Sequence, residues 1–87
     1  MIILNPEVIE ELRKRRMSGE NPSALLHYLK SQCPDNGGLG LMGMKYFREA
    51  FDFSLGQVLS IPGWASGEIP DERIDEFLLP EFNRKNL

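Results

Sequence analysis

An aromatic-rich stretch, MKYFREAFDFSLGQVLSIPGW at residues 44–64, limits the possible folds more than any other part of the chain. When its first half is placed on a helix, the apolar side covers about half of the circumference. That side consists of Met44, Tyr46, Phe47, Ala50 and Phe51. The narrow polar side holds two oppositely charged pairs at a spacing of four, Lys45 with Glu49 and Arg48 with Asp52. A helix with so narrow a polar side is buried on most of its surface, so we predict that residues 44–52 form the central helix of a small bundle.

The size and composition of the chain are those of one globular domain. With 87 residues, of which 41% are hydrophobic and 26% charged, the chain can bury one core but not two. No apolar run approaches the roughly 20 residues that span a bilayer, and residues 1–8 lack the pattern of a signal peptide. A single cysteine cannot form an internal disulfide and fits a reducing compartment. We therefore expect one helical domain over residues 1–87 that is cytoplasmic and does not contact a membrane.

The first two helices are marked by a repeated start signal. The dipeptide Asn-Pro occurs at residues 5–6 and again at 21–22, where Asn can cap a helix and Pro suits the first helical position. Ser-Gly at residues 18–19 ends the first helix, and we expect the second to run to about Cys33. Two antiparallel helices joined by a short turn are the predicted result.

A short fourth helix is predicted after the central one. Ser54 can cap it, and its inward positions should be Leu55, Val58 and Leu59. We expect Pro62-Gly63 to end this helix, with Trp64 in the following turn and its ring over the edge of the core.

A last helix is predicted from Asp71 and Glu72, which favour a first turn. Its inward residues should be Ile74, Phe77 and Leu78, with Phe82 as one more anchor beyond the end of the helix at Pro80. No segment alternates with a period of two, so the predicted fold is all-α, with about five short helices.

Motifs that would indicate catalysis or cofactor binding do not survive a check of their context. Residues 38–43 (GLGLMG) match G-x-G-x-x-G, but a helix and not a strand precedes them, so these glycines should form a flexible or closely packed start of the central helix. His27 and Cys33 point about 120° apart on one helix and cannot form a dyad, and one His with one Cys cannot hold zinc. We expect His27 on the surface and Cys33 in the core, and we predict no enzymatic activity and no cofactor or metal.

Charge is distributed unevenly along the chain. The net charge is −3, but residues 66–82 contain six acidic residues and one Arg, a local balance of −5, whereas residues 13–16 (RKRR) carry +4. The acidic segment should repel nucleic acid and attract a basic protein. The candidate partner-binding residues are Trp64, Glu68, Asp71, Glu72, Asp75 and Glu76, with Trp64 as an aromatic anchor.

Two segments, YFREAFDFSLGQVLSIPGW at 46–64 and GEIPDERIDEFLLPEF at 67–82, together resemble small bacterial proteins of the toxin-immunity kind. The resemblance lies in the aromatic helix, the Gly-Trp turn and the acidic last helix. It implies a non-enzymatic cytoplasmic protein that neutralises a cognate toxin domain.

Two other functions stay open at this point. A helix-turn-helix-like DNA-binding regulator would use the basic residues 13–16, although the second half of the chain offers few cations for phosphate contacts. A self-associating subunit would form a homodimer through apolar surface around Leu39, Leu41 and Met42.

Overall fold

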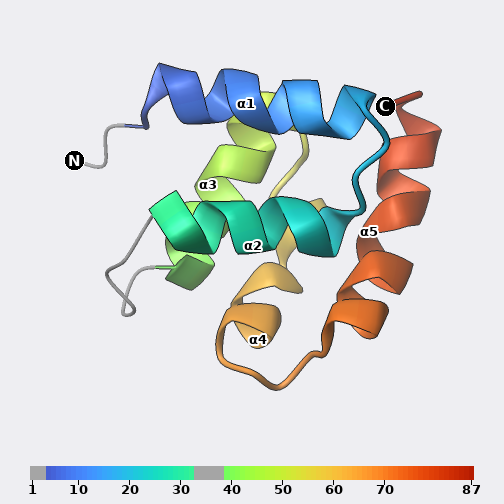
Figure 1. Cartoon of the computed structure of the whole chain (residues 1–87). Coiled ribbons are helices and arrows are strands. Elements are labelled where there is room, and N and C mark those ends of the chain that lie inside the picture. Colours follow the sequence, from blue (N-terminus) through green and yellow to red (C-terminus); the bar gives the residue numbers. More distant parts are fainter. Residues whose placement is uncertain (1–3, 33–38) are drawn as a thin grey trace.

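The computed structural model of the chain describes residues 4–32 and 39–87. Five α-helices lie in this part of the chain: α1 (Pro6–Met17), α2 (Pro22–Gln32), α3 (Leu39–Phe51), α4 (Ile61–Ala65) and α5 (Asp71–Arg84). A short 3-10 helix, η2 (Gly56–Val58), joins α3 to α4, and no strand occurs in the described residues. Figure 1 shows α1 and α2 side by side, with α5 along one edge of the bundle. The predicted all-α class is confirmed, and none of the described helices is long and apolar enough to cross a bilayer.

Helix α3 is the central helix, as predicted. It contacts α1, α2, α4 and η2, and its buried residues include Phe47 and Phe51. The helix starts at Leu39 and ends where Asp52 takes a positive φ of 56°, a conformation that stops helices. The ring of Phe51 lies 4.8 Å from that of Phe82 of α5 in an edge-to-face arrangement. The aromatic cluster at the end of α3 therefore joins the middle of the chain to its last helix.

The glycines at the start of α3 permit close packing against α4. A Cβ on Gly43 would lie 2.8 Å from Ile61 Cγ2, and a Cβ on Gly40 would lie 3.1 Å from Pro62 Cα. These two glycines of the G-x-G-x-x-G match are thus accounted for by a helix–helix contact, in agreement with the closely packed start predicted for this helix. Gly38, the first glycine of the match, and Cys33 lie outside the described residues.

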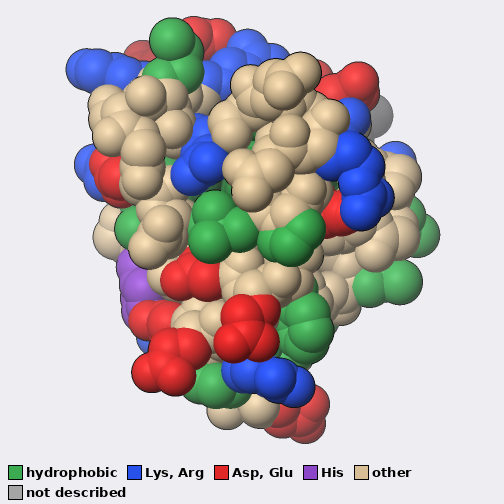
Figure 2. All heavy atoms as spheres, turned by 90° about the vertical axis from the view of Figure 1, so that its right-hand side faces the viewer, with side chains coloured by type: hydrophobic (Ala, Val, Ile, Leu, Met, Phe, Trp, Pro, Cys, Tyr) green, Lys and Arg blue, Asp and Glu red, His purple; other side chains and the backbone are tan. Residues whose placement is uncertain are grey.

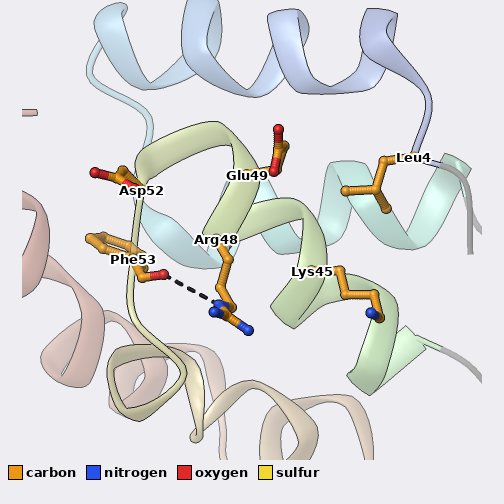
Figure 3. A pocket seen from close by; sticks show the side chains of 6 residues that line it. All are labelled: Leu4, Lys45, Arg48, Glu49, Asp52 and Phe53. Atoms are coloured by element: carbon orange, nitrogen blue, oxygen red, sulfur yellow. Dashed lines mark hydrogen bonds between the residues drawn. The ribbon is translucent and has the colours of Figure 1, made fainter.

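The polar side of α3 differs from the prediction. Among the described residues, neither Lys45 with Glu49 nor Arg48 with Asp52 forms an ion pair. Instead, Arg48 Nε donates to the carbonyl oxygen of Phe53 at 3.4 Å, and Glu49 points away from Lys45 (Figure 3). Both predicted pairs were wrong. Arg48 and Asp52 do not meet because Asp52 no longer follows helical geometry and Arg48 turns to the backbone that leaves the helix.

The fourth helix was predicted in the wrong place. Leu55 and Leu59 were expected inside but are 49% and 61% exposed, and only Val58 of the predicted trio is buried. Pro62 does not end a helix but occupies the first turn of α4, where its missing N–H is not needed. Trp64 is accordingly in a helix and not in a turn, and it is only 8% exposed.

Helix α5 continues through the proline that was expected to end it. Pro80 lies inside α5, which extends to Arg84 and carries Phe82 fully buried into the aromatic cluster. The inward stripe is Ile74, Leu78 and Phe82, at a spacing of four, whereas Phe77 is 45% exposed. Burial of Phe82 compensates for the lost hydrogen bond of Pro80, whose ring lies on the exposed side of the helix.

Candidate protein-binding surface

Acidic side chains cluster on the first half of α5. Figure 2 views this edge of the molecule and shows Asp and Glu gathered on its lower part, where α5 begins, with Lys and Arg mostly on the upper part. This polarity follows the sequence of α5, which has Asp71 and Glu72 in its first turn and Arg84 in its last. Such an order is favourable because the N-terminus of a helix is the positive end of its dipole. The helix therefore stabilises a negatively charged surface at its own start.

Asp71 is held by two neighbours. The indole Nε1–H of Trp64 donates to Asp71 Oδ1 at 2.7 Å, and His27 Nε2 of α2 lies 2.8 Å from Asp71 Oδ2. The hydrogen bond from Trp64, followed by the one with His27, lowers the pKa of Asp71 below 3.8. The rings of His27 and Trp64 also meet edge to face, with centroids 5.1 Å apart. Asp71 thus joins α2, α4 and α5, and His27 is on the surface as predicted but is not free.

Asp75, one turn further along α5, caps helix α2. Its Oδ1 accepts from the backbone N–H of Ser23 at 2.8 Å, and its Oδ2 accepts from Ser23 Oγ at 3.0 Å. The first N–H groups of a helix have no partner within the helix, and a carboxylate satisfies them well. Ser23 is only 9% exposed, so these hydrogen bonds are shielded from water. Asp75 therefore stabilises the start of α2, a role that the sequence of the acidic segment does not indicate.

The other three predicted acidic residues face the solvent. Glu68 and Glu72 are exposed and form no ion pair or side-chain hydrogen bond with any described residue. Glu76 is also exposed and lies 3.4 Å from Arg73, with both side chains more than 60% accessible. A pair that exposed contributes little to stability, so Glu76 can exchange Arg73 for another cation. Of the six residues predicted for partner binding, these three have no strong partner within the chain, whereas Asp71 and Asp75 are held by hydrogen bonds and Trp64 is buried, although the Asp71 side chain is still 51% exposed.

An apolar hollow lies beside the acidic residues, and the sequence did not predict it. Leu59 and Phe77 line a hollow of about 370 Å³ between η2 and α5, together with Gly56, Gln57, Ser60 and Glu81. Gln57 Nε2 donates to Glu81 Oε1 at 3.4 Å across this junction. Both Leu59 and Phe77 were assigned to the core because a spacing of three or four with buried residues is typical of inward positions. No signal in the sequence separates them from the residues that are buried.

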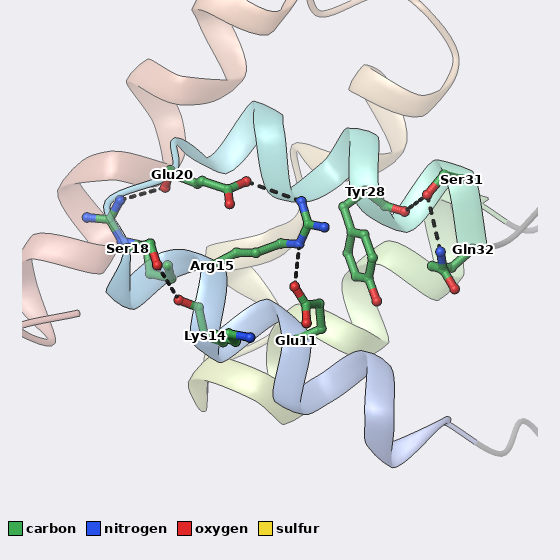
Figure 4. A network of polar contacts seen from close by, with 9 residues as sticks. Glu11, Lys14, Arg15, Ser18, Glu20, Tyr28, Ser31 and Gln32 are labelled. Atoms are coloured by element: carbon green, nitrogen blue, oxygen red, sulfur yellow. Dashed lines mark hydrogen bonds and ion pairs between the residues drawn. The ribbon is translucent and has the colours of Figure 1, made fainter.

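The basic residues 13–16 are largely engaged within the molecule. Arg15 lies between Glu11 and Glu20, at 2.8 and 3.6 Å, and over the ring of Tyr28 (Figure 4).

The other two arginines of this cluster contact the backbone. Arg13 donates to the carbonyl oxygens of Ala50 and Glu49 at the end of α3. Arg16 donates to the carbonyl oxygen of Glu20 at 2.8 Å and to that of Leu87 at 3.0 Å. Only Lys14 of the four makes no such contact with the described residues.

Other possible sites offer less chemistry. Arg13, Arg16 and Phe51 help to line a hollow of about 660 Å³, but the guanidinium groups there already donate to backbone carbonyls. Within residues 4–32 and 39–87, no group of three or more His, Cys, Asp or Glu side chains could hold a metal ion. Of the apolar surface predicted for a homodimer, Leu39 is buried and only Leu41 is strongly exposed, at 49%. The acidic part of α5 is therefore the candidate binding surface.

Comparison with known proteins gives no match: no protein family, no curated protein and no solved structure is similar to this chain.

Proposed function

We propose that this protein is a non-enzymatic binding module that engages a basic protein partner through the acidic part of α5. The observation that carries the proposal is the division among the carboxylates. Asp71 and Asp75 are fixed by Trp64 and Ser23, whereas Glu68, Glu72 and Glu76 face the solvent. These contacts of Asp71 and Asp75 hold α5 to α2 and α4 before a partner arrives, so binding has to order only the exposed glutamate side chains.

Electrostatic attraction sets the properties of such binding. Free carboxylates on one side of a small domain accelerate association with a basic surface, and salt reduces the effect. One specific form of the proposal is an immunity protein that neutralises a bacterial toxin domain in the cytoplasm, as the resemblance of residues 46–82 implies. The acidic surface would then cover a basic site of the toxin.

The test starts from the purified chain as bait in extract of its host, followed by identification of the captured protein. Affinity for that protein is then compared between wild type and a variant with Glu72→Lys and Glu76→Lys. Reversal of two exposed charges should weaken binding by about a hundredfold at low salt, because attraction becomes repulsion. The matched control is Glu10→Lys with Glu49→Lys, which changes the net charge equally on exposed positions of α1 and α3.

Equal weakening by both double variants would mean that only net charge matters and would remove α5 from the proposal. Unchanged affinity of the α5 variant would reject the acidic surface as the binding site. Circular dichroism of both variants serves to show that the helices remain formed, and substitution at Asp71 or Asp75 is avoided because both residues hold α2 to α5.

A further inference from the structure

We infer that the hollow between η2 and α5 receives an apolar side chain of the same basic partner. This inference rests on the proposed function and adds to it the chemistry of the partner: a basic amphipathic segment with a large apolar residue among its cations. The juxtaposition of an exposed apolar hollow and exposed carboxylates on one helix points to it.

The hollow exposes large apolar side chains that the core does not use. Leu59 is 61% and Phe77 45% exposed, and both line the hollow of about 370 Å³. Leu55, which directly precedes η2, is 49% exposed. Leu59 and Phe77 line the same hollow, and two large apolar side chains exposed at one site are more than the scattered exposure found on ordinary surfaces. A concave site of this size fits one aliphatic or aromatic side chain.

The charges around the hollow decide which partner fits. Residues 49–72, which include η2 and α4, contain no Lys or Arg. On α5, Glu76 directly precedes Phe77, and Glu81 lines the hollow one turn later. Among the described residues two cations lie close by: Arg73, which lies 5.7 Å from the centre of the Phe77 ring and pairs with Glu76, and Arg84, whose Nη1 lies 2.9 Å from Glu81 Oε1. A partner segment with Lys or Arg beside its apolar residue can replace Arg73, both over the ring of Phe77 and in the ion pair with Glu76.

A second copy of the chain is the competing occupant. Met17 at the end of α1 is 88% exposed and follows the exposed Lys14 and the partly exposed Arg16. Insertion of Met17 into the hollow of another copy would be a head-to-tail contact, which does not close into a symmetric dimer. The experiment below distinguishes this occupant from a basic partner.

The experiment measures binding of two synthetic helical peptides to the full chain at low salt, by fluorescence anisotropy. One peptide consists of Lys and Leu in amphipathic spacing, and the other has Ala in place of each Leu. Wild type should bind the Leu peptide about tenfold more tightly than the Ala peptide, since a filled apolar pocket is worth about that factor. Phe77→Ser and Leu59→Ser should each remove most of this preference. Met17→Ser, an equally polar change at an exposed apolar residue elsewhere, should leave it intact.

Each outcome bears on a separate part of the argument. A preference for Leu that persists in both hollow variants overturns the inference but leaves the charge recognition of the proposed function in place. If Glu72→Gln with Glu76→Gln fails to weaken both peptides, the proposed function itself fails. The molecular mass in solution is also measured against protein concentration. If it rises with concentration, and if Met17→Ser and Phe77→Ser each return it to that of the monomer, the hollow binds a second copy and the inference of a basic partner is overturned.

Discussion

The basic cluster of α1 and the acidic part of α5 are alike in sequence but opposite in use. Each is a dense group of like charges near one end of a helix. In α1, three of the four cations at residues 13–16 contact carboxylates or backbone carbonyls of their own chain. Of the five carboxylates from residue 68 to 76, in α5 and just before it, three have no strong intramolecular partner. The number of charges in a segment therefore does not show how many of them are free to bind another molecule.

The difference has a physical origin in the side chains. Arginine is long and carries a planar group with several donors, so from α1 it reaches the carbonyls at the end of α3 and in the loop before α2. Glutamate has no donor to offer these carbonyls and accepts only from N–H or O–H groups, most of which the helices already occupy. Shorter aspartates at the α2–α5 contact find such donors, and the glutamates beside them do not.

Among variants that test the difference between engaged and free charges, the largest change in stability is expected for Asp75→Ala. Removal of the carboxylate leaves the buried Ser23 N–H and hydroxyl without their acceptor, which should lower the free energy of unfolding by about 2 kcal/mol. Glu76→Ala, at the neighbouring exposed position, should change it by less than about 0.5 kcal/mol. Urea denaturation followed by the fluorescence of Trp64 measures both, and similar values for the two variants would contradict the division of the carboxylates.

A smaller effect is expected in the basic cluster. Arg16→Ala removes two hydrogen bonds to carbonyls and a guanidinium that lies 4.9 Å from the centre of the Phe82 ring, so unfolding should become easier by about 1–2 kcal/mol. Lys14→Ala is the matched control and should stay within about 0.5 kcal/mol of wild type. The same urea titration measures both free energies of unfolding. A loss of stability for Lys14→Ala as large as that for Arg16→Ala would show that the contacts of Arg16 do not distinguish it from a free cation.

Acid should reveal the contribution of Asp71. The hydrogen bonds from Trp64 and His27 hold the pKa of Asp71 in the folded state below its ordinary value of 3.8. The charged form therefore stabilises the fold fully above pH 3.8, and this stabilisation is lost as the pH falls through the folded-state pKa. The stability difference between wild type and Asp71→Asn should thus be constant well above pH 3.8 and shrink below it. Unfolding curves at several pH values measure the difference, and a difference that grows on acidification would show that the sign is wrong.

The smallest effect is expected for DNA. Because Arg13, Arg15 and Arg16 have partners within the chain, the protein should not be retained on a duplex-DNA column even in dilute buffer. Retention that disappears steeply as salt rises would show that the basic cluster is as available as the acidic one.

Signals that lie within a few residues of each other could be read from the sequence, and those that depend on packing could not. Asn5 was predicted to cap α1, and its Oδ1 does accept the N–H of Glu7 at 2.9 Å. Pro62 and Pro80 were both expected to end helices, yet Pro62 lies in the first turn of α4 and Pro80 lies inside α5. Whether the chain is helical at each proline depends on the burial of a nearby residue, Trp64 after Pro62 and Phe82 after Pro80, and not on the proline alone.

The candidate site shows the same limit. Local charge density identified five of the six carboxylates of the acidic segment as candidates, but the hydrogen bond from Ser23 to Asp75 joins residues 52 positions apart. A contact over that distance is fixed only when α2 and α5 pack. Phe77 was misassigned because residues three and four positions after the buried Ile74 both qualify for the inward stripe, and only Leu78 is used.

Placement of Phe82 at the heart of the aromatic cluster has a consequence for biosynthesis. Its ring closes over Phe47, Phe51 and Phe53, so the interior cannot be completed while residue 82 is still inside the ribosome. Until residue 82 has left the ribosome, the nascent protein lacks the ring that covers those of Phe47, Phe51 and Phe53.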